Sequence, residues 1–413
     1  MHLTDQQLPV SSDLGENSII IPPSQPFYYP RAVTSNLGLA LNGFGQAPAL
    51  SAPRGLVLLD HFHFPKQPDS LQRGKFITRP ITKLVVSNMN PGFIDASDNL
   101  IVDNSSTGLQ TCLHTLITRQ FRNYLSSKSS TAPTAGDRLR VALLDLTGDK
   151  IAQPEFAGWG STAAMYAASS AKVLAIYAAH QLRMDLRNLA TNQNIRDGRL
   201  LEKTALQTWK LSGAPDLQWL FTIRDWSGNP DTLNFTMQAR ETFRQSMHNE
   251  QAATLIMKVG FPYIASVTWQ SGLFHPTRGG LWLSSSYGKG SWASNPIPGV
   301  FSANITALSV ATYFTLLAQG RLVDDVSSNE IKTWLEGGCI TGLFPDSLGV
   351  VTSKCGIWSD YLHDCALIAR GGIRYVVVGL TRTNRNEYSK YTQLYLELDK
   401  LIARNNQTPK PAC

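Results

Sequence analysis

Apolar residues recur at helical spacing in three long stretches of the sequence. These stretches are residues 107–125, 306–322 and 388–406. A spacing of three and four residues between apolar positions is typical of an amphipathic helix with one buried face. The second stretch stops near Gly320, and glycine commonly follows the last residue of a helix. The pattern therefore predicts three helices, one of them close to the end of the chain.

Shorter apolar runs bounded by turn residues predict strands. "RLRVALLDLTGDK" (138–150) is predicted as a strand followed by a turn at Thr147-Gly148-Asp149. "CALIAR" (365–370) and "RYVVVGLTR" (374–382) flank Gly371-Gly372, which predicts a hairpin. Residues 186–245 are polar and mostly helical in pattern. We expect a mixed α/β (α+β) fold, in which helices flank an antiparallel sheet and an all-helical subdomain spans about 165–335.

The first hundred residues differ in texture from the rest. Residues 1–104 are rich in Pro, Gly, Ser and Asn with short apolar pieces, which predicts a loop-rich extension with short strands. We expect the main domain at 105–405 and a tail at 406–413. The amino terminus has no basic start followed by an apolar run, so no secretory signal is expected. No window is apolar for long enough to predict a membrane span.

Composition narrows the classes of partner and cofactor. Hydrophobic residues make up 43% and charged residues 16%, and the net charge is +7 without a Lys/Arg run, so no nucleic-acid partner is expected. The five cysteines lack CxxC spacing, so neither a metal site nor a dense disulfide framework is predicted, and no cofactor is expected. One bridge among Cys339, Cys355 and Cys365 stays open, but free buried thiols are the preferred interpretation.

One lysine interrupts a small, apolar segment. Lys172 is the only formally charged residue between Phe156 and Leu182, and Ser169 precedes it by three positions. If residues 166–182 form one helix, both side chains lie on the same face. A serine hydroxyl needs a base to become a nucleophile, and a lysine serves as that base only when burial disfavours its ammonium form. The segment therefore predicts a catalytic Ser169–Lys172 pair.

The alternative is a spacing that arose by chance. S-x-x-K is a short motif, and Ser286-Tyr287-Gly288-Lys289 repeats it in a Gly/Ser-rich loop without helical pattern. We treat that second occurrence as a decoy.

The strand at 138–150 and the following segment "MYAASSAKVLAIYAAHQL" resemble the serine β-lactamases and penicillin-binding proteins. In that family such a strand precedes a helix that begins with the S-x-x-K serine. The resemblance covers about residues 105–405. It implies a β-lactamase/transpeptidase-like fold and acyl transfer to a serine, from a small-molecule or peptide-like acyl substrate. The family usually works outside the cytoplasm.

The resemblance also assigns two further motifs. Lys354-Cys355-Gly356 matches Lys-Thr/Ser-Gly, and Met247-His248-Asn249 stands where Ser-x-Asn is expected, with Asn249 as the match. Exact Ser-x-Asn matches end at Asn304 and Asn329, but they flank the predicted helix at 306–322, which in the family follows this motif. We therefore prefer Asn249.

The family implies a role for each matched residue. Backbone N–H groups of Ser169 and Ile357, which follows Gly356, would form the oxyanion hole. Lys354 would place positive charge beside the substrate and help keep Lys172 neutral, while Asn249 would bond the substrate amide or the lysine. Cys355 replaces the hydroxyl residue that helps hold a substrate carboxylate, so poor binding of a β-lactam carboxylate is expected. His248 is either an auxiliary acid or base or merely structural.

A stretch without acids separates this sequence from class A β-lactamases. Those enzymes use a glutamate between the second and third motifs for deacylation, whereas residues 251–323 contain no Asp or Glu. Three hypotheses remain open: an active serine acyl-hydrolase or acyltransferase, a slow β-lactamase or penicillin-binding protein, and a catalytically silent binding protein with the same fold.

Overall fold

A computed structural model of the chain describes ten segments, which form two compact units. The segments are residues 107–121, 138–152, 154–209, 215–246, 248–275, 279–287, 304–336, 344–383, 387–408 and 413. The first unit, here called the sheet unit, comprises the described residues of Lys83–Ala171, Gly272–Leu281 and Asn304–Cys413. The second, the helical unit, comprises the described residues of Lys172–Ser271 and Trp282–Ala303.

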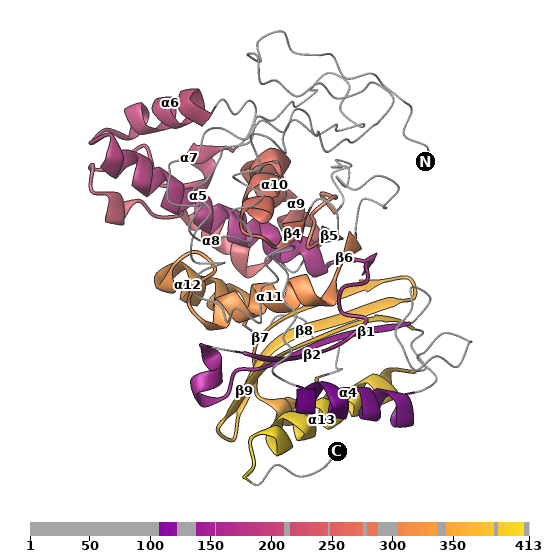
Figure 1. Ribbon diagram of the computed structural model, residues 1–413. Helices are drawn as coiled ribbons and strands as arrows, with labels where there is room; N and C mark the ends of the chain where they lie inside the picture. Colours follow the sequence, from indigo (N-terminus) through magenta and orange to yellow (C-terminus); the bar gives the residue numbers. More distant parts are fainter. Residues whose placement is uncertain are drawn as a thin grey trace, which may run out of the picture. The chain divides into compact units, whose positions relative to one another are not determined.

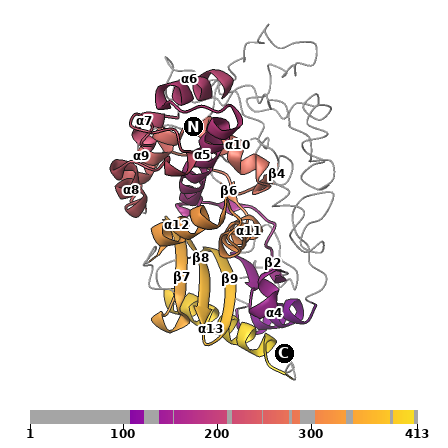
Figure 2. The same cartoon turned by 90° about the vertical axis from the view of Figure 1, so that its left-hand side faces the viewer.

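A five-stranded sheet forms the centre of the sheet unit. Its strands are β1 (Leu139–Asp145), β2 (Glu155–Trp159), β7 (Val350–Trp358), β8 (Tyr361–Arg370) and β9 (Ile373–Arg382). They are ordered β2-β1-β9-β8-β7, and all neighbours pair antiparallel. The last three strands run side by side in Figure 2. Gly371 and Gly372 join β8 to β9 with φ of 51° and 81°, the left-handed conformation that a two-residue hairpin turn requires.

Helices cover both faces of this sheet. On one face lie α4 (Thr107–Gln120) and α13 (Tyr388–Asn405), which pack side by side (Figure 1). Leu139, Val141 and Leu143 of β1 join the apolar core beneath these two helices. The alternate side chains of β1 point to the opposite face, where α11 (Ala307–Ala318) packs against β1, β8 and β9. Coverage of both faces explains why all seven residues of β1 are buried.

Smaller elements complete the sheet unit. They are α12 (Asp325–Leu335), which packs against α11 and β7, and the short strands β3 (Met165–Tyr166), β6 (Asn304–Ile305), β4 (Phe274–His275) and β5 (Gly279–Gly280). Strand β3 pairs with β6, and β4 pairs with β5.

A single buried helix organises the helical unit. The helices are α5 (Val173–Asn192), α6 (Gly198–Trp209), α7 (Leu217–Leu220), α8 (Met237–Arg244), α9 (Asn249–Val259) and α10 (Phe261–Gln270). Every residue of α5 from Val173 to Arg183 is buried, because α6, α9 and α10 pack around it. The small and apolar composition of this segment is what allows such close packing on all sides.

Most predicted elements are confirmed. The antiparallel sheet flanked by helices, the hairpin at Gly371-Gly372 and the helices near 107, 306 and 388 are all present. One prediction was wrong: residues 166–182 are not one helix. Tyr166 belongs to β3, a 3-10 helix spans Ser170–Lys172, and α5 begins only at Val173. The predicted extension at 1–104 lies outside the described residues.

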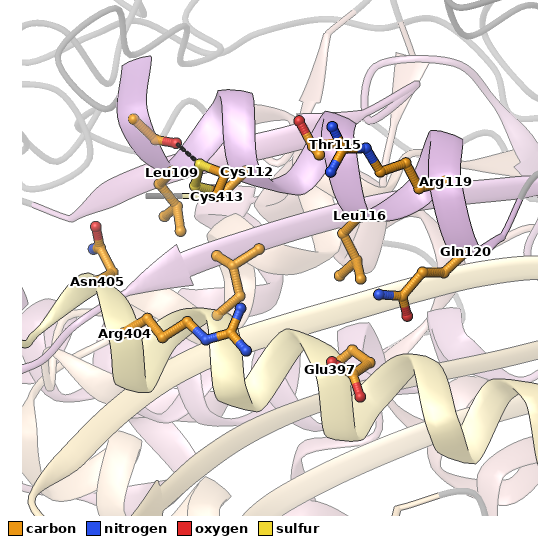
Figure 3. A pocket seen from close by; sticks show the side chains of 12 residues that line it. Leu109, Cys112, Thr115, Leu116, Arg119, Gln120, Glu397, Arg404, Asn405 and Cys413 are labelled. Carbon is orange, nitrogen blue, oxygen red and sulfur yellow. Dashed lines mark hydrogen bonds between the residues drawn. A yellow bond between two sulfur atoms is a disulfide. The ribbon is translucent and has the colours of Figure 1, made fainter. Parts of the chain in front are cut away.

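The preference for free thiols was also wrong for three cysteines. Cys112 on α4 forms a disulfide with Cys413, across a sequence separation of 301 residues. Cys355 is disulfide-bonded as well, whereas Cys365 is a buried free thiol, as expected. The Cys112–Cys413 bridge lies at a cavity of about 240 Å³ between α4 and α13, whose apolar wall includes Leu109 and Leu116 (Figure 3). The spacing of the cysteines carried no signal for the Cys112–Cys413 bond, because the two residues are far apart in the sequence and meet only after folding.

Removal of the Cys112–Cys413 bridge should destabilise the protein. We expect the double variant Cys112→Ala/Cys413→Ala to lose about 2–4 kcal/mol of unfolding free energy, because the bond no longer restricts the unfolded chain. Denaturant unfolding of both proteins under non-reducing conditions measures the difference. With reductant present, the gap between wild type and variant should close, and equal stability without reductant would contradict the prediction.

Candidate active site

Ser169 lies in a sharp turn at the entrance to the 3-10 helix. The Ser170 N–H donates to the Ala167 carbonyl oxygen at 3.0 Å, which closes a four-residue turn. Ala168, directly before Ser169, has φ of 44°, a left-handed conformation that non-glycine residues adopt infrequently. Unfavourable backbone conformations of this kind are concentrated at functional sites. Ser169 itself is partly exposed, whereas its neighbours on both sides are buried.

Strand β7 runs close to the turn that carries Ser169. A Cβ atom built on Gly356 would lie 2.6 Å from Ser170 Oγ, 3.0 Å from the Ala167 carbonyl oxygen and 3.1 Å from Ala168 Cβ. Only glycine allows the two backbones to approach this closely. The third predicted motif is therefore next to the predicted nucleophile within the sheet unit.

The other residues of that motif differ in exposure. Lys354 is 2% exposed, and its Nζ donates to the Cys355 carbonyl oxygen at 2.5 Å. Cys355 is buried, and its sulfur is committed to a disulfide. Ile357 is 47% exposed and Trp358 still more so, although both side chains are large and apolar. The end of β7 nearest Gly356 therefore presents an apolar surface to solvent.

A buried histidine fastens the segment ahead of Ser169 to the sheet. The Thr381 N–H donates to His363 Nδ1 at 3.1 Å, so the hydrogen is on Nε2, which donates to the Tyr166 carbonyl oxygen at 2.5 Å. Burial lowers the pKa of His363 to about 4, so the ring is neutral near pH 7. His363 pairs with Gly356 across β7 and β8. His363 therefore fixes Tyr166, three residues before Ser169, at the level of the sheet where Gly356 lies.

Lys172 and Asn249 meet within the helical unit. Lys172 is 3% exposed, and its Nζ donates to Asn249 Oδ1 at 2.6 Å. Asn249 is the first residue of α9, and α9 packs against α5, which Lys172 precedes. Burial lowers the pKa of Lys172 to about 8. At pH 7 about a tenth of the amine is therefore neutral and able to accept a proton.

His248 and Tyr287 are neighbours of this pair, and Tyr287 contacts the lysine. His248 is exposed at the N-cap of α9 and makes no side-chain cap bond there, so its role as an acid or base stays a prediction. Met247 lies outside the described residues. Tyr287 places its ring 4.7 Å from the Lys172 Nζ, measured to the ring centroid. This lysine therefore has a polar and an aromatic contact.

The predicted residues thus form two clusters, one in each unit. Gly356 and the turn around Ser169 belong to the sheet unit, and Lys172 and Asn249 belong to the helical unit. Ser169 and Lys172 are linked by two intervening residues of the chain. Sequence reasoning missed the strained Ala168, the anchoring His363 and the aromatic Tyr287. Tyr287 belongs to the S-x-x-K occurrence that was set aside, and nothing local in the sequence indicates its contact.

Neither a metal centre nor a membrane helix is found in the described part of the chain. Those residues contain no group of three or more His, Cys, Asp or Glu side chains that could hold a metal ion. Among the described helices, none is both long and apolar enough to cross a membrane.

Comparison with known proteins finds similarity only at the level of structure. No protein-family model matches the sequence, and no curated protein sequence matches it either. The chromosome-encoded β-lactamase of Vibrio parahaemolyticus is 13% identical with a TM-score of 0.43, over 72% of this chain and 99% of that one. A class A β-lactamase from Mycobacterium abscessus is 14% identical with a TM-score of 0.43, over 72% and 98%. PBP-A is 15% identical with a TM-score of 0.41, over 72% and 96%. Likeness at these values concerns the fold, and the activities of those proteins do not carry over to this chain.

Substitution of Gly356 tests the close approach of β7 to the turn. We expect Gly356→Ala to cost about 1–3 kcal/mol of unfolding free energy, because the new methyl group meets the Ala167 carbonyl, which cannot rotate away. Gly108→Ala on α4 is the matched control, since nothing lies within 4 Å of a Cβ there. Denaturant unfolding measures both variants. Equal stability of the two variants would show that β7 is farther from the turn than described.

Proposed function

We propose that this protein is a serine acyl-hydrolase or acyltransferase that forms a covalent ester on Ser169, with Lys172 as general base. The observation that carries the proposal is the buried Lys172 amine, whose pKa of about 8 leaves part of it neutral at physiological pH. A lysine with an ordinary pKa near 10.4 would be almost entirely protonated there and could not accept a proton. A strained turn that presents Ser169 three residues earlier supports the same assignment.

The first step transfers one proton and forms one bond. Neutral Lys172 takes the proton from the Ser169 hydroxyl, and the serine Oγ attacks the carbonyl carbon of an ester, amide or β-lactam. The tetrahedral intermediate then breaks the bond to the leaving group, which takes back the proton held by the Lys172 ammonium, so that an acyl-serine ester and a neutral Lys172 remain. Asn249 orients the lysine through the Oδ1 contact. A positioned general base of this kind typically contributes about 10²–10⁴ in rate.

Backbone donors would stabilise the developing oxyanion. We assign this role to the N–H groups of Ser169 and Ile357, and the close approach of Gly356 to the Ser169 turn supports the pairing. Loss of one such donor typically costs about 10²–10³ in rate. Lys354 would add positive charge at the same strand, where it is almost completely buried. A buried charge acts more strongly than an exposed one, because little water screens it.

The rate at which the acyl group leaves Ser169 depends on whether a carboxylate can activate water. Residues 251–323 contain no carboxylate that could activate water, and the aromatic residue that contacts Lys172 comes from this stretch. We therefore propose slow deacylation, as in a slow β-lactamase or a penicillin-binding protein, unless another acceptor takes the acyl group.

The substrate should lack the carboxylate that members of the resembling family hold with a hydroxyl at the position of Cys355. In the resembling family a hydroxyl at this place helps hold the substrate carboxylate. The Cys355 sulfur is disulfide-bonded and offers neither a hydroxyl nor a thiol proton. An uncharged ester or amide is thus favoured over a β-lactam that carries a carboxylate.

The disulfides favour an oxidising compartment as the place of action. Cys112, Cys413 and Cys355 are all bonded, and such bonds persist mainly in extracellular, periplasmic and similar oxidising surroundings. This agrees with the usual location of the family that the sequence resembles.

Acyl-probe labelling tests the nucleophile. We expect intact-protein mass spectrometry to find one acyl group per chain after incubation with a fluorescent penicillin or an activated ester, and none on Ser169→Ala. Ser170→Ala is the matched control, because it removes the neighbouring hydroxyl and keeps Ser169. An adduct that persists indicates slow turnover, and rapid loss indicates a hydrolase. Absence of any adduct on the wild type with either probe would instead support the silent binding protein.

The pH dependence of acylation tests the base. Because only neutral Lys172 accepts a proton, the second-order acylation rate should rise about tenfold per pH unit at low pH and level off above about pH 8. Lys172→Met should lower the plateau by about 10²–10⁴ and abolish this rise. Stopped-flow measurement with the ester probe from pH 6 to 10 records both profiles. A rise that persists in Lys172→Met would identify a different base.

A further inference from the structure

Tyr287 makes a direct contact with the proposed base. Its ring centroid lies 4.7 Å from the Lys172 Nζ, and the same nitrogen donates to Asn249 Oδ1 at 2.6 Å. The negative face of an aromatic ring attracts a cation within about 6 Å, and the attraction is stronger where water is excluded. Lys172 is almost completely buried, so the ring replaces part of the stabilisation that its ammonium form has lost from water.

The backbone of Tyr287 adopts a conformation that suits glycine better. Its φ is 50°, and its N–H donates to the Ser285 Oγ at 3.1 Å. A large side chain in the left-handed region is uncommon, and it persists where surrounding contacts hold it. Such a position would accept glycine or asparagine at lower cost if the ring had no role. The left-handed backbone at this large residue therefore fits a position whose side chain is held by contacts, among them the one with Lys172.

We infer that Tyr287 is a positioning residue: its ring stabilises the ammonium form of Lys172 and holds the side chain against Asn249. This rests on the proposed function, in which Lys172 is the general base. A lysine that has taken the Ser169 proton is an ammonium, and Tyr287 lowers the free energy of that form. Burial and the ring thus act in opposite directions on the same nitrogen, and their balance decides at which pH it becomes a base.

The titratable groups of the surrounding elements do not account for this balance. They are Tyr177, His180, Arg183 and Asp185 on α5, His248, Glu250 and Lys258 at α9, and Tyr263 on α10. Asp185 accepts from Tyr263, and His180 lies between Phe235 and Phe243. Burial lowers the pKa of Lys172. A ring contact is therefore the interaction to remove experimentally.

Direct titration of Lys172 tests this inference independently of acylation. Protein labelled with ¹³C,¹⁵N-lysine is titrated by NMR, and the Lys172 signal is assigned as the one missing from Lys172→Met. Tyr287→Leu keeps the bulk and removes the π face, so the midpoint should move to lower pH by about half to one unit. Tyr287→Phe keeps the ring and should titrate like the wild type.

The outcomes separate this inference from the proposed function. An unchanged midpoint in Tyr287→Leu overturns the inference, and so does a rise, which would mean that the ring acts only by excluding water. If the midpoint falls while the wild type forms no adduct on Ser169, the role of Tyr287 at Lys172 stands and the acyl-transfer function fails. If adducts form, the acylation profile of Tyr287→Leu should move to lower pH together with the NMR midpoint.

Discussion

Burial of one amine is the constraint on which the helical unit depends. An ammonium group in an apolar core is costly unless it is paired or loses its proton. The Asn249 carbonyl and the Tyr287 ring stabilise the ammonium group in part. The uncompensated free energy of burial lowers the pKa of Lys172. Under the proposed function, the lowered pKa is what lets Lys172 exchange a proton with Ser169.

The sheet unit holds the strained turn at Ala168 and Ser169 in place. Ala168 adopts an unfavourable conformation, and the turn persists because β7 lies against it at Gly356 and because His363 fastens the Tyr166 carbonyl. The strand that carries Lys354 pairs with β8 and packs against α12, and these contacts hold it beside the turn. A rigid sheet can support a turn that a short peptide would not adopt on its own.

The protein differs chemically from the family that its sequence resembles, because a disulfide-bonded cysteine replaces a hydroxyl residue in the third motif. Cys355 occupies the middle of the Lys354-Cys355-Gly356 motif, and its disulfide removes a donor from that position while it constrains the strand. Residues 251–323 contain no Asp or Glu, and an aromatic ring from this stretch, that of Tyr287, contacts Lys172. Under the proposed function, these two features favour formation of an acyl-enzyme over its rapid hydrolysis.

Local pattern determined which segments became helices and strands, since periodicity at 107–125 or 388–406 and glycines at 371–372 act within a few residues. The S-x-x-K spacing and the apolar surroundings of Lys172 likewise indicated a buried amine near a serine. Tertiary structure alone decided that Ser169 sits in a turn rather than in a helix, because β7 and His363 hold that turn from far along the chain. It also decided the contact of Tyr287 with Lys172 and the bond between Cys112 and Cys413. These are contacts over 100 to 300 residues of sequence, and no local pattern encodes which distant side chain will arrive.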